Sequence, residues 1–330
     1  MNNTVKEKCD LLFVNRDRIA SEFKWDESLM QASAAMILTG ADKETDIERL
    51  KECKKILHNN ARALSSFRST AETVVVCKMA QADDPAKFFE DLKKVYGPVS
   101  KAKFSDSGYI IQAAISICEA GRIDETDEIV AKFKELMQKM SKIHPVLTDS
   151  GDVIFAMLLA LTDKPVDTII ETIEEGYNYL RQEVKIRISA NEIQGLCEVL
   201  ALTDGNMKEK CDKVVRIYNT FLNHGIRYGK EYNEFAALGA LIDIDMDPEI
   251  LFQEIMETEA YLKTHKGFGG LSMDKKLRLL FASMLVGDTY GMDSSAINGV
   301  ALGSSLAAII AEEIALMICV IAATSTVYVN

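Results

Sequence analysis

The feature that most constrains this fold is a short sequence that occurs twice, Ala160-Leu161-Thr162-Asp163 and Ala201-Leu202-Thr203-Asp204. The copies begin at positions 160 and 201, which are 41 residues apart. Each copy ends an apolar segment and begins a turn before a charged segment, and this order of segments recurs along nearly the whole chain. Repetition at such a period predicts a stack of helical hairpins, because no single unit can bury its own apolar helix.

The apolar segments are short and apolar on almost every side, which predicts helices that are buried on most faces. Seven such segments follow one another along the chain, at residues 32–38, 74–80, 110–118, 153–161, 193–202, 235–242 and 277–286. Their spacing is longer than the ~34 residues of a tetratricopeptide repeat and lies near the ~40–47 residues of a HEAT repeat.

The segments between them are longer and amphipathic. After Asp163, for example, Ile169, Ile173 and Tyr177 follow a 3.6-residue period, with Glu and Lys on the opposite face. These segments are therefore predicted to be the outer helices of the hairpins. The turns that lead into them contain Asp84-Pro85, Lys164-Pro165 and Asp247-Pro248. Proline is well tolerated near the first position of a helix, and an Asp before it can cap the free N–H groups.

The pattern as a whole predicts an all-α protein of about seven antiparallel helical hairpins with a ~41-residue period, a HEAT-like α-solenoid. The alternative is a closed α/α toroid, in which the hairpins form a ring around a central pocket. The expected organisation is an N-terminal helical segment at residues 1–24, the hairpin array at 25–291, and an Ala-rich apolar helical cap at 292–330.

The C-terminal segment allows more than one interpretation. Residues 307–324 are nearly all apolar, but Glu312 and Glu313 interrupt the run near its middle. A membrane span needs about 20 apolar residues, and a central charge costs about 2.5–3.5 kcal/mol on insertion scales. A helix that packs on the last hairpin is therefore favoured. A homo-oligomer contact and membrane insertion are the alternatives.

The composition limits which classes of partner, and which cell compartment, are expected for this protein. The chain has 50 acidic and 38 basic residues and a net charge of −12, which disfavours binding to nucleic acid and to anionic membranes. Its 7 cysteines are scattered, and none form a Cys-x-x-Cys pair. They are expected to be reduced, buried thiols. With a polar N-terminus that is unlike a signal peptide, this predicts a cytoplasmic protein.

One stretch resembles a metal loop. Asp243, Asp245 and Asp247, with Glu254, stand at the ligand positions 1, 3, 5 and 12 of a calcium-binding EF-hand. Position 6 of that loop requires glycine, and here it is Pro248. Helix capping by these acids is therefore the favoured interpretation, and calcium binding the alternative. The chain has no nucleophile, phosphate-binding or dinucleotide motif, and no cofactor is expected.

A closed toroid would place catalytic residues at the ends of its inner helices. The acidic residues at or near the start of an apolar segment are Asp106, Asp152, Glu192 and Glu234. They are the candidate catalytic residues if the protein is an enzyme. Capping of the helix N-termini is their more ordinary role.

Three further stretches carry a family resemblance. They are His144-Pro145-Val146-Leu147-Thr148 with Asp152 and Ala156, residues 191–196 with residues 200–202, and Lys266-Gly267-Phe268-Gly269 followed by residues 278–282. With the length and the Ala-rich end, they make the chain similar to a bacterial family of uncharacterised helical proteins catalogued as a domain of unknown function. The resemblance covers essentially the whole chain. It implies a bacterial, cytoplasmic, helical protein and no particular activity, cofactor or site.

The sequence therefore predicts a non-catalytic interaction module, a scaffold or adaptor that binds a protein or peptide on the surface of its stacked repeats. The alternative is an α/α-toroid enzyme that uses the acidic residues at the inner-helix ends.

Overall fold

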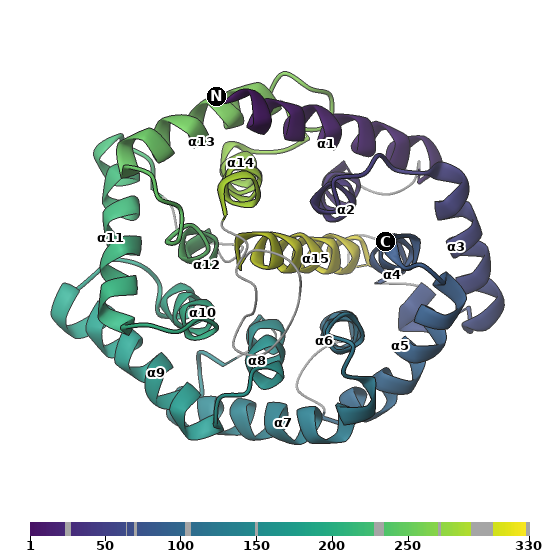
Figure 1. The fold of residues 1–330 in the computed structure, drawn as a ribbon, viewed down its shortest axis with the longest axis horizontal. Helices are drawn as coiled ribbons and strands as arrows, with labels where there is room; N and C mark the ends of the chain where they lie inside the picture. The colour runs from purple at the N-terminus through teal and green to yellow at the C-terminus, as the bar shows by residue number, and fades with distance from the viewer. Residues whose placement is uncertain are drawn as a thin grey trace.

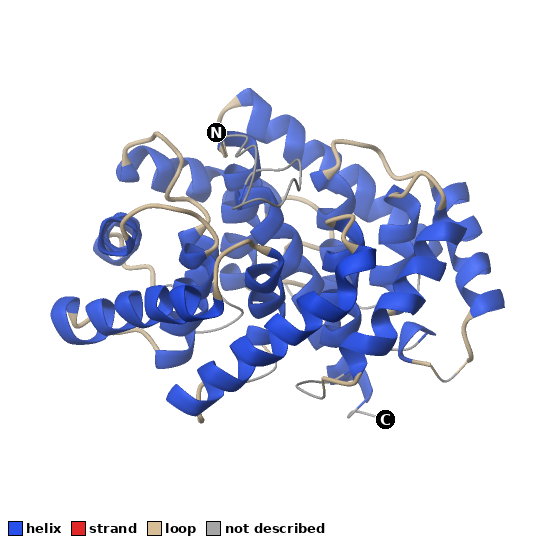
Figure 2. Ribbon diagram, turned by 60° about the horizontal axis from the view of Figure 1, so that its bottom comes forward, coloured by secondary structure: helices blue, strands red, loops and turns tan. Residues whose placement is uncertain are grey.

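The structure is a computed structural model that describes residues 1–23, 28–63, 65–68, 71–102, 107–148, 151–227, 234–269, 272–291 and 306–327. Its regular elements in these ranges are all helical, as Figure 2 shows. One set of helices is α1 Asn3–Glu22, α3 Ile47–Asn60, α5 Pro85–Ser100, α7 Thr126–Ile143, α9 Val166–Asn178, α11 Met207–Asn223 and α13 Pro248–Leu262. The other is α2 Ser28–Gly40, α4 Glu72–Gln81, α6 Ser107–Glu119, α8 Asp152–Leu161, α10 Ala190–Ala201, α12 Glu234–Gly239 and α14 Lys275–Tyr290. The last helix is α15, Leu306–Val327, and short helical turns lie at Ser66–Arg68, Ile123–Glu125 and Tyr179–Val184.

These helices form a closed ring, with the first set outside and the second set inside (Figure 1). Successive hairpins lie side by side around the ring, and α1 packs against both α13 and α14. The last inner helix, α14, thus lies between α13, the outer helix that precedes it, and α1, from the other end of the described chain. The prediction of an all-α protein is confirmed. The hairpins adopt the closed arrangement of the alternative prediction, and not the open solenoid that the repeat period favoured.

The division into inner and outer helices follows from the apolar pattern. Every residue of α8, from Asp152 to Leu161, is buried. In α7, by contrast, one face is buried through residues such as Ile129, Phe133 and Met140, while the opposite face is open to solvent. Small residues bring inner helices close together: a Cβ added to Gly239 of α12 would lie 2.6 Å from the Cδ1 atom of Leu196 in α10.

The turns between inner and outer helices contain the expected caps. The Asp84 and Asp247 side chains accept N–H bonds from the first turns of α5 and α13, and Pro85 and Pro248 begin those helices. In the third turn, Pro165 itself occupies the cap position of α9. Both predicted Asp caps are therefore formed, and the third turn, where Lys164 precedes the proline, has no side-chain cap.

The repeated Ala-Leu-Thr-Asp sequence marks the ends of α8 and α10, where backbone carbonyls have no partner in their own helix. The Arg122 guanidinium, from the preceding hairpin, donates to the Leu161 carbonyl at 2.6 Å. One unit later, Lys164 caps the end of α10: its Nζ atom donates to the carbonyls of Ala201 and Thr203, each at 2.9 Å. Each of these inner-helix ends is therefore capped by a cation from the preceding unit.

The ring is closed by the Lys266-Gly267-Phe268-Gly269 stretch and the residues around it. Gly267 has φ +95°, which favours glycine, and it lies directly against the guanidinium of Arg16 on α1. Phe268 is fully buried, with its ring centroid 5.7 Å from that of Phe13 on α1. The Tyr261 hydroxyl on α13 donates to Asp10 on α1 at 2.6 Å. The stretch noted in the sequence is thus the joint between the two ends of the ring.

A buried ion pair fixes this joint from the inside. Arg278 on α14 donates from Nε to the Glu259 carboxylate on α13 at 2.7 Å, and both side chains are 7 % exposed. The same guanidinium donates to the carbonyls of Phe268 and Met273. Arg278 therefore holds the loop between α13 and α14 in the shape that receives α1.

Candidate binding site at the centre of the ring

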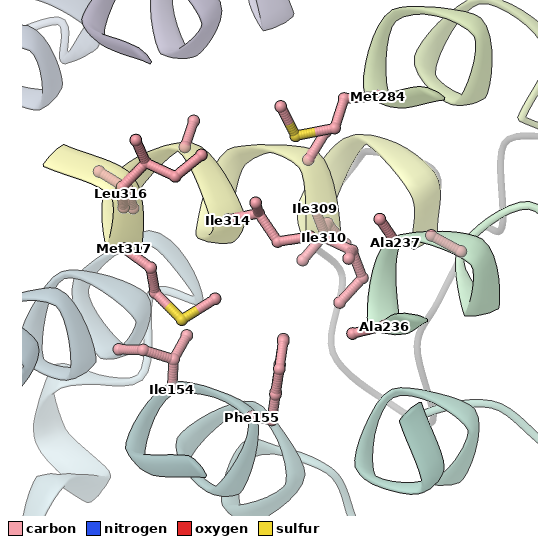
Figure 3. Packing of buried hydrophobic residues seen from close by; sticks show 14 of the residues in the cluster. Ile154, Phe155, Ala236, Ala237, Met284, Ile309, Ile310, Ile314, Leu316 and Met317 are labelled. Atoms are coloured by element: carbon pink, nitrogen blue, oxygen red, sulfur yellow. The ribbon is translucent and has the colours of Figure 1, made fainter. Parts of the chain in front are cut away.

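The centre of the ring is occupied by α15, which lies across it among the inner helices, these being seen nearly end-on in Figure 1. α15 contacts α2, α4, α6, α12 and α14. Between Ile309 and Cys319, every side chain except that of Glu312 is buried. Figure 3 shows Met317 directed toward Ile154 and Phe155 of α8, and Ile310 close to the alanines of α12. Within the described residues, no helix is both long enough and apolar enough to cross a membrane.

A lysine in the middle of the ring joins α15 to two inner helices. The Lys78 side chain, on α4, is 2 % exposed, and its Nζ atom lies 2.5 Å from the Glu119 carboxylate at the end of α6. The same Nζ atom also pairs with Glu312 of α15. One buried cation is therefore shared by two carboxylates, each of which is 31 % exposed.

The neighbouring residue Glu313 is buried among neutral partners. The Gln112 amide of α6 donates to its Oε2 atom at 2.6 Å, and the Ser116 hydroxyl donates to Oε1 at 3.1 Å. Burial removes water from the carboxylate and disfavours its charged form. This desolvation raises the pKa of Glu313 to about 7, although the hydrogen bonds from Gln112 and Ser116 act in the opposite direction.

Beside this polar cluster is a cavity of about 240 Å³. It lies at the C-terminal ends of the inner helices, and α15 forms one of its walls. Its ionisable lining residues are Lys78, Glu119, Asp288, Glu312 and Glu313. Asp288 is paired with Lys8 of α1 at 2.7 Å, and burial raises its pKa. The cavity is smaller than the ~300–1,000 Å³ of typical ligand pockets, so it fits a small group.

The acids predicted from the inner-helix starts lie at the other ends of these helices. Asp152, Glu192 and Glu234 are all buried, with exposed fractions of 4 %, 7 % and 1 %. The Glu192 carboxylate accepts the backbone N–H of Phe235 in the first turn of α12 at 3.0 Å, whereas the start of its own helix, α10, is capped by Ser189. A ten-residue helix such as α8 is about 15 Å long, which separates these acids from the cavity. Asp106 lies outside the described residues.

The acids of the predicted calcium loop have other partners. Asp247 caps α13 by accepting the Glu249 N–H at 2.9 Å. Glu254 accepts the backbone N–H of Asn2 at 2.6 Å and lies 3.6 Å from the N-terminal ammonium. Asp243 and Asp245 line a separate surface pocket beside Lys213 and Arg216. Across the described ranges, no three His, Cys, Asp or Glu residues are grouped so that they could hold a metal ion.

One model of a known protein family matches the chain. The model of a family described as "Protein of unknown function (DUF4003)" matches residues 15–315. The chain belongs to this family. No curated protein and no solved structure matches the chain. The match includes all seven inner helices, the Lys266–Gly269 stretch with Arg16 and Arg278, and the part of α15 that carries the polar cluster, whereas Asp10 and Phe13 precede it.

Sequence reasoning missed the residues of the polar cluster as a group, although three of them leave a signal. Lys78 lies inside the apolar segment 74–80, and Glu312 and Glu313 lie inside the apolar segment 307–324. A charged residue in a segment that is otherwise buried must find a partner. Pairing the lysine of one segment with a glutamate of the other would have joined α15 to the ring. Gln112 and Ser116 leave no comparable signal.

Proposed function

We propose that this DUF4003 protein is a non-catalytic interaction module that binds a protein or peptide partner through a cationic group placed in the central cavity. The observation that carries the proposal is the excess of carboxylates in the lining, where Glu119, Asp288, Glu312 and Glu313 accompany one lysine, Lys78, and, among the described residues, only Asp288 has a further cation, Lys8 of α1. A cavity of this size accepts a lysine or arginine side chain, or an amino terminus. The net charge of −12 also attracts a basic partner.

The cytoplasm is the proposed compartment. All seven cysteines are free thiols, and six of them are buried, which fits a reducing environment. A homo-oligomer contact through α15 is not part of the proposal, because the side chains of Ile309–Cys319 face the interior of the ring, apart from the partly exposed Glu312.

Tetralysine is a suitable probe for this site. We expect calorimetry at pH 7.5 to give a measurable heat of binding with tetralysine and none with tetraglutamate. Glu119→Gln should weaken binding about tenfold, the effect of ~1.4 kcal/mol from one lost charge pair. Lysine amide, titrated in parallel, shows whether a free amine is sufficient or a peptide is required.

The control separates the cavity from the general negative charge of the protein. Glu135, on the outer face of α7, has a 52 % exposed side chain paired with Lys139. Glu135→Gln changes the net charge as much as Glu119→Gln does. If both variants weaken tetralysine binding equally, or if tetralysine does not bind, the proposed site is wrong.

An α/α-toroid enzyme is the second candidate function. Ring closure and the burial of Asp152, Glu192 and Glu234 at the starts of three successive inner helices favour it. Catalytic carboxylates usually cost stability, whereas capping carboxylates contribute to it. We therefore expect Asp152→Asn and Glu234→Gln to raise the thermal midpoint of unfolding if these residues are catalytic. A lower midpoint for both variants, measured by calorimetry, would assign them to capping.

A further inference from the structure

Glu313 is a buried acid whose hydrogen-bond partners are neutral. It is 4 % exposed, and it accepts hydrogen bonds from the Gln112 amide and the Ser116 hydroxyl. The one cation close to it, Lys78, is already shared between Glu119 and Glu312. A negative charge on Glu313 would therefore be a third carboxylate charge beside one lysine, on a side chain that is almost fully buried.

The other helices that pack against α15 supply no cation to Glu313. α2 has no titratable residue, and the only ones in α8 and α12 are Asp152 and Glu234, each in the first turn of its helix. On α14, Arg278 is paired with Glu259 at the ring joint, and Lys275 and Lys276 lie in the first turn. Asp288, at the other end of α14, is acidic and is paired with Lys8 of α1, which also contacts Asp42.

We propose that α15 is a proton-operated element of this fold, and that ionisation of Glu313 weakens the seating of α15 in the ring. In the seated state the protonated acid fits its neutral surroundings, whereas the ionised acid requires water. Release of the segment around Glu313 from the inner helices provides that water. The inference does not depend on the proposed function, but it bears on the same cavity, because Ile309, Ala311, Glu312 and Glu313 form one of its walls.

The direction of the effect follows from proton linkage. The pKa of Glu313 is raised from its ordinary value of 4.5 to about 7 when it is buried, mainly by desolvation. Below pH 4.5, Glu313 is protonated in both the seated and the released state, and the seated state has its greatest stability. Between the two values the seated state binds the extra proton, so its stability falls as pH rises. Above about pH 7, Glu313 is ionised in both states, and the stability of the seated state falls no further. The response therefore ends close to neutral pH.

Hydrogen–deuterium exchange of the full-length protein tests this inference, because it reports the opening of α15 separately from that of other helices. Exchange in peptides covering residues 306–327 should be compared at pH 5, 6, 7 and 8 for the wild type and for Glu313→Gln. Glutamine has the shape of the protonated acid and cannot ionise. Comparing the two proteins at one pH also cancels the intrinsic effect of pH on exchange.

We expect α15 of the wild type to lose protection relative to the variant by about tenfold per pH unit from pH 5 to 7, and by about 100-fold in total. The peptides of α7, an outer helix that is not among the helices packed against α15, should be equally protected in both proteins, which shows that the variant is folded. Glu135→Gln should behave as the wild type in α15. A constant ratio between wild type and Glu313→Gln across this pH range would overturn the proposal.

Discussion

Arg278→Met is expected to lower the free energy of unfolding by about 3–5 kcal/mol, the usual cost of removing one partner from a buried ion pair. Glu259 would remain 7 % exposed without its cation, and the carbonyls of Phe268 and Met273 would lose a donor. Because these groups shape the loop that meets α1, the loss should be greatest at the ring joint. Urea denaturation measures the loss in the free energy of unfolding. Hydrogen exchange of α1 and α13 shows whether this loss is concentrated at the ring joint.

Two variants make this result specific. Arg122→Met also removes an arginine that is hydrogen-bonded to a carbonyl, but its carboxylate partner, Glu125, is 46 % exposed. We expect this control to cost about 1 kcal/mol or less. The double variant Arg278→Met/Glu259→Leu should be more stable than the single variant, since no buried charge is left unpaired. A loss below about 1 kcal/mol for Arg278→Met would contradict the role given to this pair.

Lys78→Met has the second largest expected effect. It removes the cation that Glu119 and Glu312 share and leaves two carboxylates facing each other at the centre of the ring. We expect a loss of about 3 kcal/mol, at the lower end of the range for buried pairs, because each carboxylate is 31 % exposed. Chemical denaturation measures the loss in the free energy of unfolding. Cys319 of α15, which is 1 % exposed, should also become more reactive toward thiol reagents, because α15 is held less firmly.

The lysine variant also has a matched control and a rescue. Lys94 forms a pair with Asp91 on the outside of α5, and its side chain is 68 % exposed. Lys94→Met should therefore leave the stability almost unchanged. Lys78→Met/Glu312→Gln should recover part of the loss, because it removes one of the two facing charges. If Lys94→Met and Lys78→Met cost the same, the cluster does not hold α15.

The hairpins could be predicted from the sequence because their causes are local and repeated. The all-round apolar character of segments such as 153–161 predicts an inner helix, and the one-sided pattern of Ile169, Ile173 and Tyr177 predicts an outer one. The Asp84 and Asp247 caps follow from the same kind of local evidence.

Closure of the ring could not be predicted in this way. It depends on contacts between the two ends of the chain, such as that between Asp10 and Tyr261, which are 251 residues apart. No period relates these residues, and the open and closed arrangements bury the same repeated apolar faces. The signals of closure are single residues, Gly267, Phe268 and Arg278, whose partners become known only in three dimensions.

The candidate site was beyond prediction for a similar reason. The acids at the inner-helix starts were identified by their position in the repeat, and Asp152, Glu192 and Glu234 are indeed buried together with those starts. The cavity, however, combines residues of several inner helices with α15, which does not belong to the repeat. Its key contact joins Lys78 to Glu312, and these residues are 234 positions apart.

The contact of α1 with α13 and α14 affects how the protein folds as it is synthesised. α1 packs on α2, which is made directly after it, but its other inner neighbour, α14, is the last of the seven inner helices to be made. At 5–20 residues per second, the interval between Arg16 and Arg278 is roughly 10–50 s. Throughout this time the apolar face of α1 that contains Leu12, Phe13 and Ile19 lacks its final partners. The nascent chain thus remains an incomplete ring until α14 has been made, and closure joins segments that are synthesised far apart in time.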